Sequence, residues 1–467
     1  MYSFYTEYYI NEPYEEISLF NSSKINNIYL MKINNTIMEP VSTFNFSNII
    51  GNNKVYFYIN ENASISLSYM FSNQNNLVNF SFNDKYMNNF IINDISGMLS
   101  SCINLKYVTI NLSEGKNLTN ISNLFSSCSG LISVELSIAN SINLKDMNNL
   151  FANCNSLENI NMKNLNTKNV INMSYIFFNC NSIKLLDTSY FNTENVIDMK
   201  YMFFNCTQLI SLDLNNFNTK NVQYMSGLFL RCESLSSLVF NKFNTENVVD
   251  MSQMFFNCHS LTSLQLTHFN TKNVEDMQQM FYNCDKLINL DISNFNTQKV
   301  EIMYYMFKNC ENLNSLNLSN FNTSNVVILE GMFAGCQKLG HLDLSRFNTE
   351  KVISMKQMFF FCINLKSLDV SNFNTKKVKY MTSMFEDCFS LTSLDLSNFN
   401  IENAYNINYM FYSCNELNYL DISGIIIYNN VYLFDQLPKD CIIKVNYKSY
   451  HRIKDIPSYC QIIFVQD

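Results

Sequence analysis

Hydrophobic and polar positions along most of the chain follow one pattern that repeats every 26 residues. The stretch "FNTENVVDMSQMFFNCHSLTSLQL", which contains Met251 and Cys258, is followed 26 residues later by "FNTKNVEDMQQMFYNCDKLINLDI". A period of about 20–29 residues is typical of leucine-rich repeats, whose units stack because none can bury a core alone. The pattern therefore predicts one solenoid, although a chain of 467 residues would otherwise suggest several domains.

Each repeat contains two local periodicities. Leu212 and Leu214 flank Asp213, and apolar residues two apart point to one face of a β-strand. The second half has apolar residues three and four apart, which is typical of one helix face. In one repeat these are Val248, Met251, Met254, Phe255 and Cys258, with Thr245 or Asn247 as N-cap. We expect an α/β leucine-rich-repeat solenoid, a curved stack of about thirteen strand–helix coils with a parallel sheet.

The ends of the array depart from this period. We expect the solenoid over 65–423, beginning with a degraded coil that has Gln74 near the place of the usual cysteine. Residues 1–64, with short β-like runs such as "KVYFYI", are interpreted as an N-terminal cap. Residues 424–467, with "CIIKVNY" and "CQIIFV", are interpreted as a C-terminal cap with two closing strands.

Thirteen cysteines share one register, at 102, 128, 154, 180, 206, 232, 258, 284, 310, 336, 362, 388 and 414. Their place on the apolar face predicts small buried hydrophobic side chains. Disulfides between coils are disfavoured, because neighbouring helices lie about 8–10 Å apart and a disulfide needs Cα atoms within about 7 Å. There is no Cys-x-x-Cys motif and the four histidines form no ligand set, so neither a metal nor a cofactor is predicted. Whether Cys441 and Cys460, outside the register, are bonded stays open.

Other side chains recur in the same register. An aromatic spine is expected from Phe191, Phe217, Phe243, Phe269, Phe295, Phe321, Phe347, Phe373 and Phe399. The asparagine after each phenylalanine, from Asn192 to Asn400, is expected to be buried and to satisfy backbone groups of the turn. The repeated methionines are expected to fill the core. The residue after each repeated threonine alternates in charge, which we interpret as pairing between adjacent coils: Lys168, Glu194, Lys220, Glu246 and Lys272.

Composition limits the classes of function. The net charge is -8, the sequence pI is about 5.2 and basic residues form no runs, which argues against a nucleic-acid partner. No run of apolar residues is long enough for an integral membrane segment, and the start has no signal-peptide pattern. There is also no P-loop, glycine-rich phosphate cradle or Ser-His-Asp arrangement, so no enzyme is predicted.

The outward strand position carries a row of mostly acidic residues. It comprises Asp187, Asp213, Gln265, Asp291, Asn317, Asp343, Asp369, Asp395 and Asp421. One interpretation is a solvated face whose oxygens also bond to the turns. A second is a docking surface for a basic protein partner. A third is a calcium site formed by stacked carboxylates.

Phe-Asn-Thr, Val-x-x-Met-x-x-Met-Phe and the cysteine recur together over roughly residues 100 to 423. This combination resembles the 26-residue bacterial surface protein repeat of the BspA-like leucine-rich-repeat group. The resemblance implies a surface or secreted adhesion protein with a host-derived protein partner. The chain shows no lipobox cysteine near its start and no wall-sorting tail. The alternative is a cytoplasmic interaction scaffold, favoured by free thiols and the missing signal. Oligomeric state is not predicted.

Overall fold

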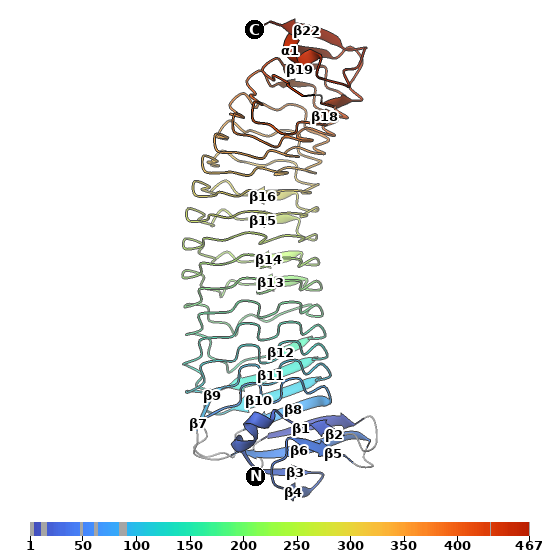
Figure 1. Cartoon of the computed structure of the whole chain (residues 1–467). Helices are drawn as coiled ribbons and strands as arrows, with labels where there is room; N and C mark the ends of the chain where they lie inside the picture. Colours follow the sequence, from blue (N-terminus) through green and yellow to red (C-terminus); the bar gives the residue numbers. More distant parts are fainter. Residues whose placement is uncertain are drawn as a thin grey trace. The chain divides into compact units, whose positions relative to one another are not determined.

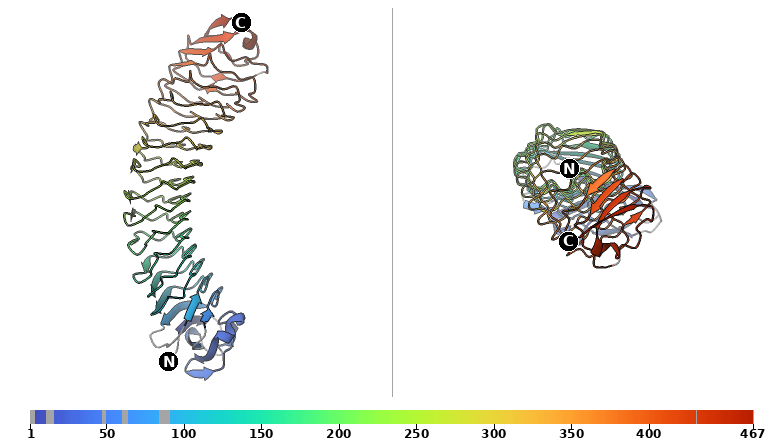
Figure 2. Two further views of the ribbon diagram at one scale, coloured as in Figure 1. Left: turned by 90° about the vertical axis from the view of Figure 1, so that its left-hand side faces the viewer. Right: turned by 90° about the horizontal axis from the view of Figure 1, so that it is seen from above.

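The computed structural model describes residues 4–10, 16–46, 50–59, 64–83, 91–429 and 431–466. The chain divides into two compact units. Unit 1 comprises Met1–Val222 and Leu228–Phe243, and unit 2 comprises Gln223–Gly227 and Asn244–Asp467. Within each unit successive coils lie side by side as a parallel β-solenoid, which is visible in Figure 1 and again after a quarter turn in Figure 2.

Unit 1 contains an eight-stranded sheet that changes from antiparallel to parallel pairing. The elements of the unit are β1 (Phe4–Ile10), β2 (Glu16–Ser18), the 3-10 helix η1 (Ser22–Asn27), β3 (Ile28–Ile33), β4 (Thr36–Met38), β5 (Thr43–Asn45), β6 (Gly51–Ile59), β7 (Ser64–Ser66), β8 (Leu77–Asn83), β9 (Ile91–Asp94), β10 (Tyr107–Leu112), β11 (Ser133–Ile138), β12 (Asn159–Asn161), β13 (Ser211–Asp213) and β14 (Ser237–Val239). The strand order is β12-β11-β10-β8-β1-β6-β3-β4. Strand β1 pairs antiparallel with β6 and β8, whereas β8, β10, β11 and β12 pair in parallel.

Unit 2 continues the coil pattern in short parallel strands. Its elements are β15 (Ser263–Gln265), β16 (Asn289–Asp291), β17 (Ser393–Asp395), β18 (Phe411–Tyr412), β19 (Tyr419–Ile422), β20 (Phe434–Asp435), β21 (Ile442–Asn446), α1 (Tyr447–Tyr450) and β22 (Gln461–Val465). Strands β17, β19, β21 and β22 form one parallel sheet in that order, so the two closing strands expected near the C-terminus are present. The domain limits at 64 and 423 stay predictions, and parts of both expected caps lie outside the described residues.

The helix expected in the second half of each coil does not form. In the coil of Met251, the N–H of Met254 donates to the carbonyl of Met251 and the N–H of Cys258 to that of Phe255, which are turn bonds between residues three apart. Gln253 and Asn257 both have φ of 57°, the left-handed region that an α-helix of L-residues excludes. Among the described residues, only α1 has α-helical hydrogen bonding.

These turns are joined to the next coil by backbone hydrogen bonds. The N–H of Gln253 donates to the carbonyl of Gln278 at 2.9 Å, and that of Asn257 to the carbonyl of Tyr282 at 2.8 Å. A residue that tolerates left-handed backbone is needed before each cysteine, and asparagine does so better than most. Asparagine has this role at Asn153, Asn179, Asn205, Asn257, Asn283 and Asn309.

The thirteen cysteines of the repeat register are buried, as predicted. Twelve of these thiols lie within hydrogen-bond distance of a backbone carbonyl oxygen of the preceding coil. The Sγ of Cys310, for example, is 3.1 Å from the carbonyl oxygen of Phe281. Burial raises the pKa of Cys336 to about 12. All fifteen cysteines are free thiols. The helix-spacing argument against disulfides was wrong, because parallel neighbours without helices lie about 4.8 Å apart.

Two phenylalanine rows fill the core. The predicted row is buried, and its members Phe191 and Phe217 meet edge-on with centroids 6.1 Å apart. The second row forms near-parallel stacks, as between Phe281 and Phe307 at 5.6 Å and 3°. The asparagine row from Asn192 to Asn400 was expected to be buried, but it is mostly exposed. Its side chains do bond the turn, as where Asn192 Oδ1 accepts the N–H of Glu194 at 3.0 Å.

Candidate functional site

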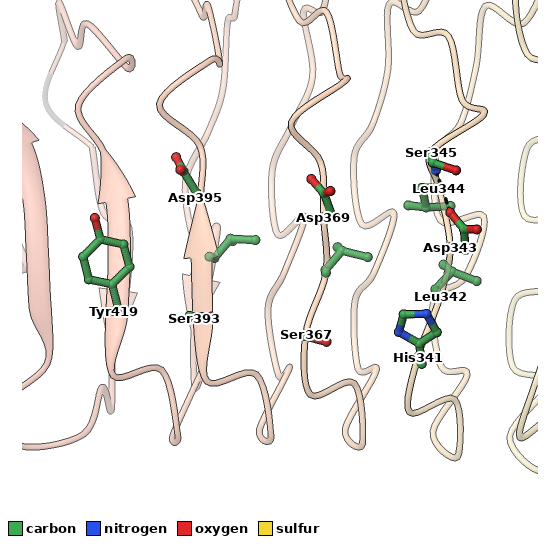
Figure 3. A pocket seen from close by; sticks show the side chains of 12 residues that line it. His341, Leu342, Asp343, Leu344, Ser345, Ser367, Asp369, Ser393, Asp395 and Tyr419 are labelled. Atoms are coloured by element: carbon green, nitrogen blue, oxygen red, sulfur yellow. Dashed lines mark hydrogen bonds between the residues drawn. The ribbon is translucent and has the colours of Figure 1, made fainter.

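Three aspartates of the predicted row line one open groove in unit 2. Asp343, Asp369 and Asp395 come from successive coils and stand in line on neighbouring strand segments, as Figure 3 shows. The groove has a volume of about 520 Å³. Side chains alternate between the two faces of a strand, so the three carboxylates point outward. The leucine directly before each aspartate is buried, namely Leu342, Leu368 and Leu394.

Each of these carboxylates is held by a turn at the end of its strand. The Oδ1 atoms of Asp343, Asp369 and Asp395 each accept the backbone N–H of the residue two positions on, at 2.9 Å. This bond fixes the carboxylate beside its own backbone. The aspartate oxygens therefore do bond the turns, as the solvated-face interpretation expected.

The same bonds keep the groove negatively charged. The N–H of Ser345 lowers the pKa of Asp343, and the N–H of Ser371 lowers that of Asp369. The charge of Asp343 opposes this effect at Asp369, because the two carboxylates lie on adjacent coils. Both groups are thus ionised at neutral pH.

The ring side chains of His341 and Tyr419 lie at the two ends of the groove, and the sequence prediction did not single them out. His341, Ser367, Ser393 and Tyr419 occupy the same register position, two residues before the aspartate position. The two serines lie in the middle, and the larger side chains lie at the ends (Figure 3). The signal was present in the sequence, since His341 and Tyr419 replace the serine that is usual at this position.

The remaining members of the row lie in different surroundings. In unit 1, Asp187 and Asp213 are exposed and accept turn N–H groups, and the Ser189 hydroxyl and N–H lower the pKa of Asp187. In unit 2, Gln265 and Asn317 are exposed and Asp291 is half-buried.

Asp421 does not belong to the open face. Its side chain is 3% exposed, and its Oδ2 lies 2.8 Å from the Nζ of Lys444 on β21. Burial alone would raise the pKa of Asp421, but the ammonium of Lys444 and the donors of Ser423 outweigh it and hold the pKa below its ordinary value. This carboxylate is already paired within the fold.

The sequence model of one protein family matches the repeat region six times. The family is described as "Mycoplasma protein of unknown function, DUF285", and the matches cover 65–185, 119–211, 145–264, 204–317, 257–366 and 303–424. Together they span 360 of the 467 residues, from 65 to 424. The chain belongs to the DUF285 family.

Solved structures similar to this DUF285 chain include several leucine-rich-repeat proteins. A leucine-rich repeat protein from Bacteroides ovatus is 14% identical, with 83% of this chain and 94% of that chain covered and a TM-score of 0.40. A leucine-rich cell surface protein from Faecalibacterium prausnitzii is 16% identical, with coverages of 68% and 78% and a TM-score of 0.31. The functional domain of InlJ from Listeria monocytogenes, which includes a cysteine ladder, is 16% identical, with coverages of 72% and 74% and a TM-score of 0.17. No curated protein matches the chain.

Three further observations concern this DUF285 chain as far as the structure describes it. In those residues, no group of three His, Cys, Asp or Glu side chains is arranged to hold a metal ion. Nor does that part of the chain contain a helix long and apolar enough to cross a membrane. A second groove, of about 720 Å³ in unit 1, is lined by asparagines and by Tyr9 and Tyr107.

Proposed function

We propose that the chain is a non-enzymatic recognition scaffold that binds a basic segment of a protein partner. The partner lies along the carboxylates of Asp343, Asp369 and Asp395. The observation that carries this proposal is the alignment of three outward carboxylates over one groove, each fixed by the same turn bond. The carboxylates are preorganised before a partner binds, so binding costs little conformational entropy of the protein.

The spacing of the row suits an extended basic peptide. Neighbouring strand segments lie about 4.8 Å apart, so the three carboxylates span roughly 10 Å. Arginine and lysine side chains at alternate positions of an extended peptide reach this spacing, and guanidinium groups bond carboxylates with two parallel hydrogen bonds. Ser367 and Ser393 add hydroxyl groups on the groove floor.

The repetition of one environment also supports a binding role over catalysis. A general acid–base pair requires two groups whose surroundings move their pKa values apart. At Asp343 and Asp369 the shift has the same direction and the same cause.

The test uses a fluorescent peptide of alternating arginine and serine and measures its dissociation constant by anisotropy. The variant D343N/D369N/D395N removes three charges and keeps the turn bonds, because Asn317 already accepts the equivalent N–H at 3.1 Å. We expect wild-type protein to bind the peptide and the triple variant to lose most of this affinity. Binding is expected to weaken with salt.

A matched control removes three negative charges from other exposed positions of unit 2, in E311Q/E402Q/E416Q. This control is expected to bind like wild type. Equal loss of affinity in both triple variants would show a general charge effect and contradict the proposed site. Equally tight binding of a peptide with glutamine in place of arginine would also contradict it.

The location that we propose for this activity is the cell surface, with a host or matrix partner, as the sequence resemblance implies. The second candidate, a cytoplasmic scaffold, is supported by the thirteen cysteines of the repeat register, which are all free thiols. Protease treatment of intact source cells distinguishes them. Cleavage before lysis supports the surface role, and survival until lysis supports the cytoplasmic one.

A further inference from the structure

Cys441 and Cys460 are the two cysteines outside the repeat register, and the C-terminal sheet places them beside each other. Cys441 directly precedes β21 and Cys460 directly precedes β22. These strands pair in parallel with Ile442 opposite Gln461, so the two cysteines occupy the preceding facing position. The N–H of Gln461 donates to the carbonyl of Cys441 at 2.8 Å, which extends the pairing to this position.

The separation suits a disulfide. Neighbouring strands lie about 4.8 Å apart, within the Cα separation of roughly 4.4–6.8 Å that disulfides span. The two thiol groups are also close enough to hydrogen-bond with each other, and each affects the pKa of the other.

Access to solvent separates Cys460 from the thirteen cysteines of the repeat. Those thirteen are buried, and the Sγ of Cys414, for example, lies 3.2 Å from the carbonyl oxygen of Phe385. Cys460 is partly exposed, whereas the other fourteen cysteines are buried. A soluble disulfide therefore reaches Cys460 first, with Cys441 directly behind it.

We propose that Cys441 and Cys460 form a disulfide that fastens the edge strand β22 to β21. The oxidant is a low-molecular-weight disulfide such as oxidised glutathione. The Cys460 thiolate attacks one of its sulfurs and releases a thiolate, and the Cys441 thiolate then attacks the mixed disulfide at the Cys460 sulfur and releases the second. Two electrons pass from the protein thiols to the oxidant, and the two thiol protons go to the released thiolates.

The bond acts on the exposed edge of the sheet. β22 is the last strand of its sheet, and Ile463 and Phe464 are each 47% exposed. An edge strand with exposed apolar side chains is prone to pair with other chains when it detaches. The disulfide joins cysteines nineteen positions apart in sequence, so it restricts the conformations of the chain most when β22 is detached. It forms in an oxidising compartment and stays open in a reducing one.

The test equilibrates the purified full-length protein with oxidised and reduced glutathione, blocks remaining thiols and maps linkages by mass spectrometry. We expect loss of two hydrogen atoms and one cross-link, between the peptides of Cys441 and Cys460. Burial raises the pKa of both thiols, so the reaction is expected to speed up as pH rises. Oxidation should raise the melting temperature by a few degrees and slow amide exchange in β22.

Two variants serve as controls. C460S should abolish the cross-link and the redox dependence of melting, whereas C414S should retain both, because Cys414 belongs to the buried row. A cross-link between repeat cysteines, or none under oxidising conditions, would overturn the proposal. The cross-link is mapped in the wild-type protein, so this mapping tests the proposal even if C460S folds poorly.

Discussion

The hydroxyl of Thr323 forms two hydrogen bonds with the backbone of Asn348 in the next coil. Its Oγ1 donates to the Asn348 carbonyl at 2.8 Å and accepts the Asn348 N–H at 2.7 Å. Thr323 is fully buried. The threonine of Phe-Asn-Thr thus joins adjacent coils, and the same pair of bonds recurs at Thr271, Thr297, Thr349 and Thr375.

Replacing this hydroxyl should destabilise the array although the shape is kept. T323V leaves the partly buried N–H and carbonyl of Asn348 without their partner, which costs about 1–3 kcal/mol. The free energy of unfolding in urea measures this. T262V is the control, because Thr262 is exposed and its change should lie within about 0.5 kcal/mol. Equal stability of the two variants would refute a structural role for the buried hydroxyl.

The ring of Tyr305 in the preceding coil leaves no room for a side chain at Gly331. Its φ is 55°, and a Cβ atom added there would lie 2.2 Å from Cε1 of Tyr305. We expect G331A to lower the free energy of unfolding by about 1–3 kcal/mol.

G340A provides the comparison, because the nearest atom to its added Cβ is the carbonyl oxygen of Asn364 at 3.7 Å. That variant should be neutral or slightly more stable. The cost of G331A should shrink in a Y305A background. An unchanged cost there would assign the effect to backbone strain alone.

Asp276 should make stability depend on pH in the acid range. Burial raises its pKa, and the neighbouring charge of Asp250 adds to this. A carboxyl with a raised folded-state pKa contributes stability below its unfolded pKa of about 3.9, and this is lost as pH rises through the folded pKa. D276N removes this loss of stability at higher pH, because the amide does not ionise. The turn bond should be kept, because Asn406 at the equivalent position accepts the N–H of Asn408 at 2.9 Å.

We therefore expect D276N to be more stable than wild type at neutral pH, with the difference vanishing near pH 3. Urea midpoints measured across this range check it. Lower stability of D276N at neutral pH would contradict the assigned cause.

Charge pairs between coils should show a salt-dependent effect on melting. Lys168 and Glu194 lie 4.0 Å apart in unit 1, and Lys272 and Glu246 lie 2.6 Å apart in unit 2. Each exposed pair contributes only about 0–1 kcal/mol. Replacing Glu194 and Glu246 by lysine places like charges on adjacent coils, so the melting temperature should fall in low salt but not in high salt. An equal shift in both conditions would mean that packing, and not charge, is responsible.

Much of the fold could be predicted from the period and the alternation of apolar residues. Stacking, short parallel strands and the burial of the cysteine row follow from them. The helix was predicted wrongly, because two successive turns also place apolar residues three and four apart. The asparagine before six of the thirteen repeat cysteines was the discriminating signal, since Asn257 and its equivalents adopt left-handed backbone.

The site was predictable only where it depends on the repeat. Asp369 and its neighbours face outward because they alternate with buried leucines. The pairing of Asp421 with Lys444 depends on the register of β21, outside the period, and no repeat pattern could predict it.

The most direct test of the acidic face changes the row in opposite directions. Asn317 lies one coil before Asp343 and has the same turn bond, so N317D adds a carboxylate to the row, while D369N removes its central one. The dissociation constant of the arginine–serine peptide is measured for both at low salt. We predict tighter binding by N317D and weaker binding by D369N, each by roughly 1.5- to 5-fold. Unchanged binding in both variants would contradict the claim that this row recognises the partner.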